Sequence, residues 1–516
     1  MTDVWHIPIP DEARTRLLAE VVATKLAAGD MITLRGDLGV GKTTFARHLI
    51  RALLGDAAAE VPSPTFTLVQ TYEMPRFPIR HFDLYRIASA DDLHELEFDD
   101  ADGETLTIVE WPERAADQLG HCRLDIMIRD RGADNEDARE IAIAATPAAA
   151  GRLSRMRAAY DFVCEAFNIE ALAALHLSYL QGDASTRSYA RVRAGSRPQL
   201  LMDMPKQPDG PTIQGGKTYS EIAHLAEDAR PFVAIASALS NAGLSVPSID
   251  AFDQTRGLAL IEDFGDLTFA AAMRSGVLQA ELWHAAVDVL VHLRRFPPSP
   301  EIVVGGDVCY TMPSYDANVM HAEMALLGDW YWPHVTGKPI DARAHSEFSH
   351  LWAPLIDQVA TRPDNSDTSA WVLRDFHSPN LLWMPQRDGL ARVGVIDFQD
   401  AQIGHAAYDL VSLALDARLD VSRDLHEALL DAYCEKVGAQ NPGFDDAAFR
   451  RAAAVIGAQR STKLLGIFAR LSRRDGKHDY LQHIPRSRRY LDWCLAHPEL
   501  ADLKAWYDAN LPSGAT

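Results

Sequence analysis

Short apolar runs separated by polar, glycine-containing loops dominate the first part of the chain. Met31–Arg35, Ile79–Asp83 and Leu106–Trp111 have the length and composition of buried strands, and Glu140–Ala144 reads as a closing strand. A helix is expected ahead of these strands, over Asp11–Ala28. The pattern thus predicts a domain of helices and short strands, and two of the strands have an acidic residue at or near their carboxyl end.

A link of small residues at Thr146–Gly151 follows, and we place a domain boundary near residue 150. Beyond it, Leu153–Phe167 has the spacing of an amphipathic helix that is able to pack on either domain. Two strands joined by a polar turn are then predicted at Leu177–Leu180 and Tyr189–Arg193.

The remainder of the chain is mostly helical, with a few apolar strands inserted. The strand Gln199–Asp203, the helix Pro231–Ala242 and a strand that runs into a hinge at Gly257–Gly265 come first. Further helices are expected at Leu278–Arg295, Asn318–Trp330, Ala344–Ala360, Leu425–Val437, Ala447–Leu471 and Ser487–Ala496. Three short buried strands interrupt them, at Trp371–Leu373, Leu381–Trp383 and Val393–Ile396.

Length and charge narrow the class of protein. A chain of 516 residues is too long for one core, so two to four domains are expected. The 72 acidic and 50 basic residues give a formal charge of −22. Such a surface repels polyanions, which argues against a broad nucleic-acid or anionic-membrane footprint and leaves room only for a local basic patch.

The cysteines and the N-terminus indicate a cytoplasmic protein. Five scattered cysteines, none in a C-x-x-C pair, support neither a disulfide framework nor a zinc site. The first residues carry no basic and apolar leader pattern, and no stretch approaches 18 uninterrupted apolar residues. No membrane association is therefore expected.

A phosphate-binding pattern follows the strand Met31–Arg35. The pattern is G-x-x-x-x-G-K-T in a strand–loop–helix setting, in which backbone N–H groups close around the phosphates of ATP. The lysine reaches the β- and γ-phosphates, and the first threonine hydroxyl takes Mg²⁺. We expect nucleotide contacts from Gly36, Asp37, Gly39, Val40, Gly41, Lys42, Thr43 and Thr44.

Two acids at strand ends complete this first site. Asp83 closes Ile79–Asp83 and is a candidate for the second magnesium carboxylate, while Glu110 either coordinates magnesium or orients the attacking water. Either acid alone reads more simply as a solvated turn residue. Their pairing with a P-loop favours the metal-site interpretation.

These motifs resemble the TsaE family, the small ATPases of bacterial tRNA threonylcarbamoyladenosine synthesis. The resemblance rests on Gly36–Thr44, Val61–Leu68, His81–Arg86 and Val109–Pro112, in family-like order. It implies a P-loop α/β fold over residues 1–150, with Thr65 in a loop near the metal. It also implies work in a complex with the transferase subunits of that pathway, with only indirect contact to tRNA.

A second phosphotransfer pattern lies between the late strands. Asp375 and Asn380 are separated by four residues, and Asp397 ends the next strand. In a catalytic loop, one carboxylate orients the accepting hydroxyl, and the Asn and the second carboxylate hold magnesium against the phosphates. Asp375 is thus the candidate base, and Asn380 and Asp397 are candidate metal ligands. Chance is the alternative explanation, because Asp and Asn both favour turns.

Other features of the second part are less specific. The turn before Tyr189 contains Ser185 and Arg187 and is either a plain hairpin or a cover over the nucleotide phosphates. Asp203 stands where a eukaryotic-type kinase places its phosphate-binding lysine, so Lys206 or Lys217 substitutes or the lysine is absent. Asp409 either ties the catalytic loop in place or is a simple first-turn acid.

Residues 170–500 resemble the aminoglycoside-phosphotransferase-like kinases, most closely their AmgK branch. The resemblance rests on Gly182–Arg187, Leu201–Asp203, Leu373–Trp383 and Ile396–Asp400, although Leu373 stands where much of the superfamily has His. It implies an α+β bilobal kinase over residues 151–516, with a small lobe at about 170–265 and a large lobe at about 266–500. It also implies nucleotide contacts from Ser185 and Arg187.

Together the two resemblances imply a bifunctional protein, an ATPase subunit for tRNA modification joined to an ATP-dependent kinase for the anomeric hydroxyl of N-acetylmuramate and N-acetylglucosamine. Two alternatives stay open. The kinase acts on another small molecule, such as an aminoglycoside, choline or an amino acid, or the first domain binds nucleotide only to assemble a complex.

Overall fold

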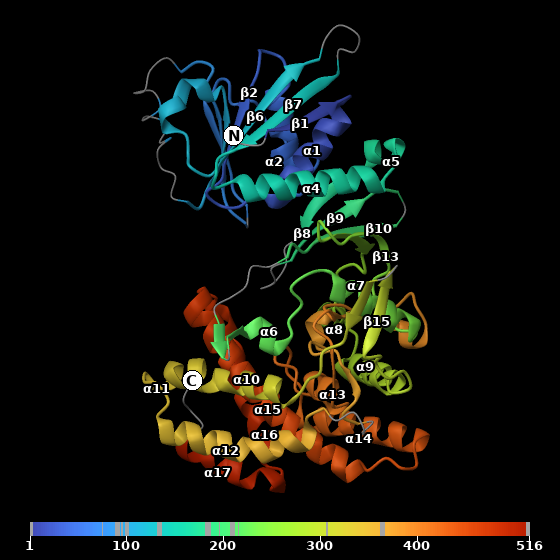
Figure 1. Cartoon of the computed structure of the whole chain (residues 1–516). Coiled ribbons are helices and arrows are strands. Elements are labelled where there is room, and N and C mark those ends of the chain that lie inside the picture. The colour runs from blue at the N-terminus through green and yellow to red at the C-terminus, as the bar shows by residue number, and fades with distance from the viewer. Residues whose placement is uncertain are drawn as a thin grey trace. The chain divides into compact units, whose positions relative to one another are not determined.

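The computed structural model describes residues 4–511 apart from 75, 88–92, 94–95, 97, 99–102, 132–136, 181–186, 196, 207–211, 215, 306–307 and 362–366 (Figure 1). The chain forms two compact units. One contains Met1–Pro205 with Ile249–Asp263, and the other contains Lys206–Ser248 with Phe264–Thr516. None of the helices in the described part of the chain is long and apolar enough to cross a membrane. The domain boundary near residue 150 stays a prediction.

The first unit begins with a seven-stranded mixed sheet, blue to cyan in Figure 1. Its spatial order is β1 (Trp5–Ile9), β7 (Arg139–Ala145), β6 (Arg123–Asp130), β2 (Met31–Arg35), β5 (Leu106–Glu110), β4 (Ile79–Asp83) and β3 (Val69–Tyr72). The predicted strands at 31–35 and 79–83 match these bounds. β1, β3 and β6 were not predicted.

Parallel pairing places the predicted residues of the first site together at the carboxyl ends of three neighbouring strands, β2, β5 and β4. β2 pairs in parallel with β5, and β5 pairs in parallel with β4, so that Asp83 lies opposite Glu110 in the register. The glycine-rich loop leaves the same end of β2. Carboxyl ends of parallel strands are where α/β folds bind their ligands.

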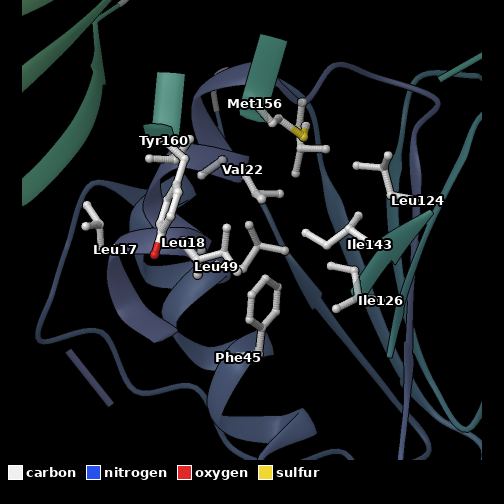
Figure 2. Close-up of a cluster of buried hydrophobic side chains, with 14 of the residues drawn as sticks. Leu17, Leu18, Val22, Phe45, Leu49, Leu124, Ile126, Ile143, Met156 and Tyr160 are labelled. Carbon is white, nitrogen blue, oxygen red and sulfur yellow. The ribbon is translucent and has the colours of Figure 1, made fainter. Parts of the chain in front are cut away.

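Three helices cover a face of this sheet. They are α1 (Glu12–Lys25), capped by the Asp11 side chain, α2 (Lys42–Leu54), which ends on the left-handed Gly55, and α4 (Ala150–Ala166). Figure 2 shows their apolar side chains meeting those of β6 and β7, with Tyr160 and Met156 of α4 facing α1. The amphipathic helix predicted at 153–167 therefore packs on the P-loop side.

A second, antiparallel sheet completes this unit. The short α5 (Ile169–Ala174) precedes it, and its order is β13 (Ile249–Asp253), β14 (Leu258–Glu262), β10 (Pro198–Asp203), β9 (Ser188–Arg193) and β8 (His176–Leu180). Buried residues of β8, β9, β10 and β14 belong to the same hydrophobic cluster as the first sheet. The two sheets therefore share one core, which the sequence pattern did not reveal.

The second unit is mostly helical. Its helices are α6 (Tyr219–Ala223), α7 (Arg230–Asn241), α8 (Phe269–Arg274), α9 (Gln279–Leu293), α10 (Ala317–Leu326), α11 (Trp332–Thr336), α12 (Ala342–Val359), α13 (Ala407–Ala414), α14 (Arg423–Gln440), α15 (Asp446–Asp475), α16 (Ile484–Leu495) and α17 (Ala501–Asn510). The helix predicted at 318–330 instead ends at Leu326 and continues as a π-helix at Leu327–Tyr331. α15 approaches this segment so closely that a Cβ on Gly466 would lie 2.5 Å from the Leu326 backbone.

Four two-stranded sheets lie among these helices. They pair β11 (Thr212–Gln214) with β12 (Lys217–Thr218), β15 (Glu301–Gly305) with β16 (Val308–Thr311), β17 (Ala370–Val372) with β20 (Gln402–Gly404), and β18 (Leu381–Trp383) with β19 (Val393–Val395). β17, β18 and β19 are the three short strands predicted around the polar loop. They fix both ends of the loop that carries Asp375.

Candidate active sites

The glycine-rich loop of the first unit has the backbone that its glycines allow. Gly36 has φ 137°, and a Cβ there would meet the Ile128 carbonyl oxygen at 2.3 Å. Gly41, with φ 111°, caps the N-terminus of α2. A side chain at Gly36 would collide with the Ile128 carbonyl group, and at Gly41 the positive φ angle would strain any residue other than glycine. The N-terminus of α2 then faces a cavity of about 250 Å³.

Lys42 is held inside this loop. Its Nζ donates to the Gly36 and Asp37 carbonyl oxygens, both at 2.8 Å, and lies 3.7 Å from the centre of the Trp111 ring. Burial lowers the pKa of the lysine, although Glu110 and Asp83 act in the opposite direction. An ammonium group poised in this way can exchange its carbonyl partners for phosphate oxygens.

The two strand-end acids meet hydroxyl groups in the same cavity. Thr43 Oγ1 donates to Glu110 Oε2 at 2.9 Å, and Thr65 Oγ1 donates to Asp83 Oδ2 at 2.7 Å. Both carboxylates are buried. The structure therefore brings together the predicted residues of the P-loop, Asp83 and Glu110, and it adds Thr65 from the loop that the resemblance singled out.

This group fits magnesium, which prefers oxygen ligands and needs only one or two protein carboxylates when a nucleotide supplies phosphates. Hydroxyl and carboxylate oxygens are the available donors. No cluster of three or more His, Cys, Asp or Glu side chains suited to a metal occurs within the described ranges. Magnesium here stays a prediction.

His81 is a site residue that the sequence reasoning missed. It is fully buried, and its Nε2 lies 3.1 Å from Glu110 Oε1, which fixes the orientation of that carboxylate. Its Nδ1 has no hydrogen-bond partner among the described residues. The signal was available, because His81 stands two positions before Asp83 and alternate residues of a strand share a face.

We expect Glu110→Gln to keep nucleotide binding yet slow ATP hydrolysis about 10- to 100-fold, the usual range for losing a partner that orients a metal ligand. The change removes the charge that faces Thr43 but preserves the shape of the side chain. Titration with a fluorescent ATP analogue and steady-state phosphate release measure the two quantities. Glu113→Gln, an exposed acid that contacts Arg35, is the matched control. Equal loss of binding and hydrolysis would assign Glu110 a structural role.

The second site lies on the loop between β17 and β18. The Asp375 side chain is about 39% exposed, and His377 Nε2 lies 3.8 Å from its Oδ1 atom, beyond hydrogen-bond range. Burial lowers the pKa of His377, which favours the neutral ring. Among the residues that the structure describes, the Asp375 carboxylate has no hydrogen-bond donor. It is available to an incoming hydroxyl group.

Asn380 and Asp397 lie together beside Asp375. Asn380 Nδ2 donates to the Asp375 carbonyl oxygen at 3.0 Å and to Asp397 Oδ2 at 3.3 Å, and Gln399 Nε2 lies 3.2 Å from Asp397 Oδ1. With its amide nitrogen used in this way, the Asn380 Oδ1 atom accepts no hydrogen bond within the described part of the chain. An amide oxygen next to a carboxylate is a suitable magnesium pair.

Buried acids hold this loop by its backbone. Leu373 N and Arg374 N donate to the two oxygens of Asp409, at 2.6 and 3.0 Å, and Ser378 N donates to Asp416 Oδ2 at 2.8 Å. The interpretation of Asp409 as an anchor of the catalytic loop is confirmed. Burial raises the pKa of Asp409 to about 7, although the hydrogen bonds from the two N–H groups act in the opposite direction. Asp416 was not identified from the sequence.

Two residues of this site have left-handed backbones. Arg374 has φ 75° and Asp397 has φ 62°. Such conformations cost about 1–3 kcal/mol each for residues other than glycine and persist only where the surroundings enforce them. Strain of this kind therefore falls directly before the candidate base and on a candidate metal ligand.

The small-lobe predictions have different outcomes. Ser185 lies outside the described residues. Arg187 lies just before β9, 3.5 Å from the Tyr189 hydroxyl, and its contact with nucleotide stays a prediction. Asp203 is buried and bonded to Lys25 at 2.5 Å and to Arg155. Its carboxylate therefore serves to join β10 to α1 and α4. Whether Lys206 or Lys217 replaces the kinase lysine, or the lysine is absent, stays open.

Two family models match successive parts of the chain. The family model described as "Threonylcarbamoyl adenosine biosynthesis protein TsaE" matches residues 9–141, and that described as "Phosphotransferase enzyme family" matches residues 176–451. A Rickettsia felis protein named "tRNA threonylcarbamoyladenosine biosynthesis protein TsaE" is 42% identical over 103 residues, which is 20% of this chain and 60% of that protein.

The kinase relatives are matched over most of their length. A Caulobacter vibrioides protein named "N-acetylmuramate/N-acetylglucosamine kinase" is 38% identical over 342 residues, covering 64% of this chain and 91% of the relative. A Pseudomonas aeruginosa protein of the same name is 32% identical, covering 64% and 88%. The chain therefore belongs to the phosphotransferase enzyme family and is a fusion in which a TsaE domain precedes a kinase domain of the aminoglycoside-phosphotransferase type.

Proposed function

We propose that the kinase domain transfers the γ-phosphate of ATP to the anomeric hydroxyl of N-acetylmuramate or N-acetylglucosamine. The observation that carries this proposal is the arrangement of Asp375 beside the hydrogen-bonded pair Asn380 and Asp397. The sugar is suggested by the names of the Caulobacter and Pseudomonas relatives.

In this proposal each side chain has one task. Asp375 orients the sugar hydroxyl and accepts its proton, and Asn380 and Asp397 hold Mg²⁺ at the phosphates. The metal neutralises charge on the transferred group when it is bound. Phosphoryl transfer of this kind depends mainly on positioning, which the anchored loop provides.

A panel of acceptors tests the substrate. The full chain is the right material, because the strands of the small lobe share their core with the TsaE domain. Acceptor-dependent ADP release is measured with N-acetylmuramate, N-acetylglucosamine, kanamycin, choline and amino acids, and the Asp375→Asn chain supplies the blank for hydrolysis in the TsaE domain. We expect turnover with the two sugars alone. Turnover with kanamycin and none with the sugars would replace this proposal by an antibiotic kinase.

We also propose that the TsaE domain hydrolyses ATP as a subunit of the complex that makes threonylcarbamoyladenosine in tRNA, with the transferase subunits as partners and only indirect contact with tRNA. The family match, the position of Lys42 inside the glycine-rich loop and the hydrogen bond from Thr43 to Glu110 support this proposal.

Its test is phosphate release by the Asp375→Asn chain, with and without the purified transferase subunits. We expect turnover that rises when the subunits are present. ATP-dependent assembly without any turnover would indicate a nucleotide-controlled assembly module instead.

A further inference from the structure

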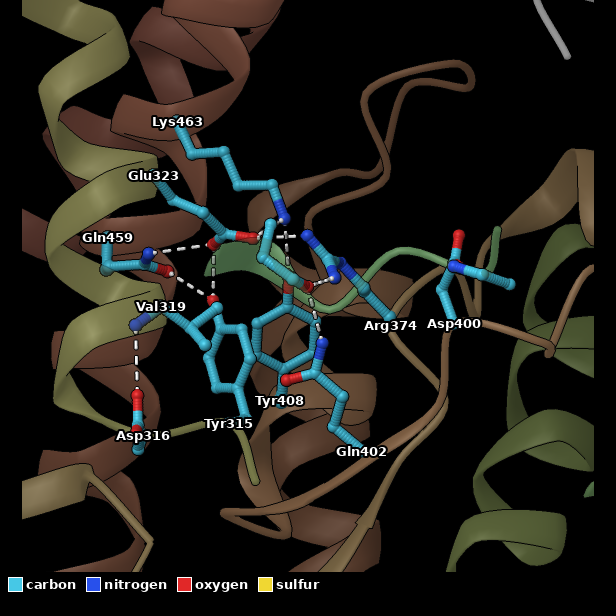
Figure 3. Close-up of polar contacts among 12 residues, drawn as sticks. Tyr315, Asp316, Val319, Glu323, Arg374, Asp400, Gln402, Tyr408, Gln459 and Lys463 are labelled. Carbon is cyan, nitrogen blue, oxygen red and sulfur yellow. Dashed lines mark hydrogen bonds and ion pairs between the residues drawn. The ribbon is translucent and has the colours of Figure 1, made fainter. Parts of the chain in front are cut away.

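A single buried carboxylate gathers four donors behind the catalytic loop. Glu323, on α10, accepts from Arg374 and Lys463 on Oε1, both at 2.7 Å. Its Oε2 accepts from Tyr315 Oη at 2.5 Å and from Gln459 Nε2 at 3.1 Å. Figure 3 shows these side chains converging on Glu323 from α10, α15, the catalytic loop and the segment before α10.

The charges of this cluster are all present at neutral pH. Burial alone would raise the pKa of the Glu323 carboxyl, but Lys463 and Arg374 outweigh that effect and lower it to about 2. Buried ion pairs contribute little net stability, because desolvation offsets their attraction. A cluster of two cations on one carboxylate is therefore better explained by what it holds in place.

Arg374 connects the cluster to the chemistry. Its side chain donates to Glu323 and, through Nη1, to the Ala223 carbonyl oxygen at 2.7 Å. Its backbone N–H is bound by Asp409. The residue is thus held from two sides in a left-handed conformation, and Asp375 is the next residue in the chain.

We propose that Glu323 is a positioning residue for phosphoryl transfer, acting through Arg374 to fix the left-handed turn that aims the Asp375 carboxylate. The proposal rests on the kinase function and is independent of which acceptor the kinase uses. Lys463 has a secondary part, since it contacts Glu323 and the Tyr408 hydroxyl.

Three variants separate an effect on the position of Asp375 from effects on the stability of the fold and on the net charge of the cluster. Lys463→Met removes one cation and leaves the bond between Glu323 and Arg374 intact. The double variants Glu323→Met/Lys463→Met and Glu323→Gln/Lys463→Met lose one charge of each sign, so the cluster keeps its native net charge. Of the two, the Glu323→Met chain alone lacks an acceptor for Arg374 at this position, whereas the amide of the Glu323→Gln chain retains one.

We expect the turnover number to fall about 100-fold in the Glu323→Met/Lys463→Met chain, the scale of a misplacement of about 1 Å. Lys463→Met should stay within about threefold of the native chain, and the Glu323→Gln double variant should fall between the two. The KM values for ATP and for the acceptor should change by less than about threefold throughout. Turnover is measured with whichever acceptor the native chain uses, at a temperature where circular dichroism shows every variant folded.

Equal turnover in Lys463→Met and both double variants would overturn the proposal, even if their melting temperatures differ. A loss confined to KM would overturn it as well. If Glu323→Met/Lys463→Met does not fold, the test is the turnover of the Glu323→Gln double variant relative to that of Lys463→Met. Equal turnover in these two chains would then overturn the proposal. If the native chain does not phosphorylate the sugars, that result counts against the proposed substrate only. The turnover of each variant relative to the native chain can then still be measured with another acceptor.

Discussion

Asp375→Asn should lower the turnover of the kinase by about 10² to 10⁴, the usual range for losing a general base. The carboxylate is partly exposed and lies beyond hydrogen-bond distance of the His377 ring. The loop is held through backbone groups instead, by Asp409 and Asp416 and by the bond from Asn380 to the Asp375 carbonyl oxygen. An amide of the same shape should therefore preserve the fold and the nucleotide affinity while it removes the proton acceptor.

The matched control is Asp388→Asn, the same chemical change at an exposed position between β18 and β19. Its turnover should equal that of the native chain. Acceptor-dependent ADP release gives the turnover number, and binding of an ATP analogue gives the affinity. If Asp375→Asn retained more than about a third of native turnover, another group would have to be the base.

The grouping of the candidate residues at each site was predictable because it follows from local rules. A glycine pattern after an apolar strand specifies a phosphate loop, and acids that close parallel strands come to the same edge of a sheet. Asp83 and Glu110 are adjacent for that reason. Asp375, Asn380 and Asp397 are joined by a short hairpin, β18 to β19, so their spacing in sequence nearly determines their spacing in space.

What could not be predicted depends on contacts between distant parts of the chain. Glu323 and Lys463 lie 140 residues apart, and nothing in the helical pattern of either segment marks them as partners. The left-handed backbone at Arg374 is imposed by this cluster and by Asp409, since Arg has no local preference for it. A buried charge in a helix becomes interpretable only when its partners are known.

The organisation of the small lobe is the second feature that the sequence pattern did not reveal. Asp203 is an acid at the position where a eukaryotic-type kinase has a lysine, and in the structure it binds Lys25 and Arg155 of the preceding part of the chain. The buried apolar residues around it continue from the first sheet into the second. Hydrophobic periodicity identifies the strands, but it does not say which of two neighbouring domains they pack against.

Lys42→Ala should abolish nucleotide binding and hydrolysis in the TsaE domain while kinase turnover stays within about twofold of the native value. In the native chain the ammonium group makes two hydrogen bonds to loop carbonyls, and we expect it to exchange them for phosphate oxygens. Bonds to charged partners contribute about 1.5–3 kcal/mol each, so losing two weakens binding about 10²- to 10⁴-fold. The kinase should be spared, because the contacts of Lys42 are with Gly36, Asp37 and Trp111, all inside the P-loop site.

The reciprocal control is the Asp375→Asn chain, which should lose phosphorylation of the acceptor and keep hydrolysis in the TsaE domain. ATP-analogue binding is compared between the native chain and Lys42→Ala, and phosphate release and formation of the phosphorylated acceptor are followed separately. Parallel loss of both activities in Lys42→Ala would refute the independence of the two sites. The shared core would then be the physical route, because α2 begins at Lys42 and buries Phe45 and Leu49 in the same cluster as Leu177 of β8.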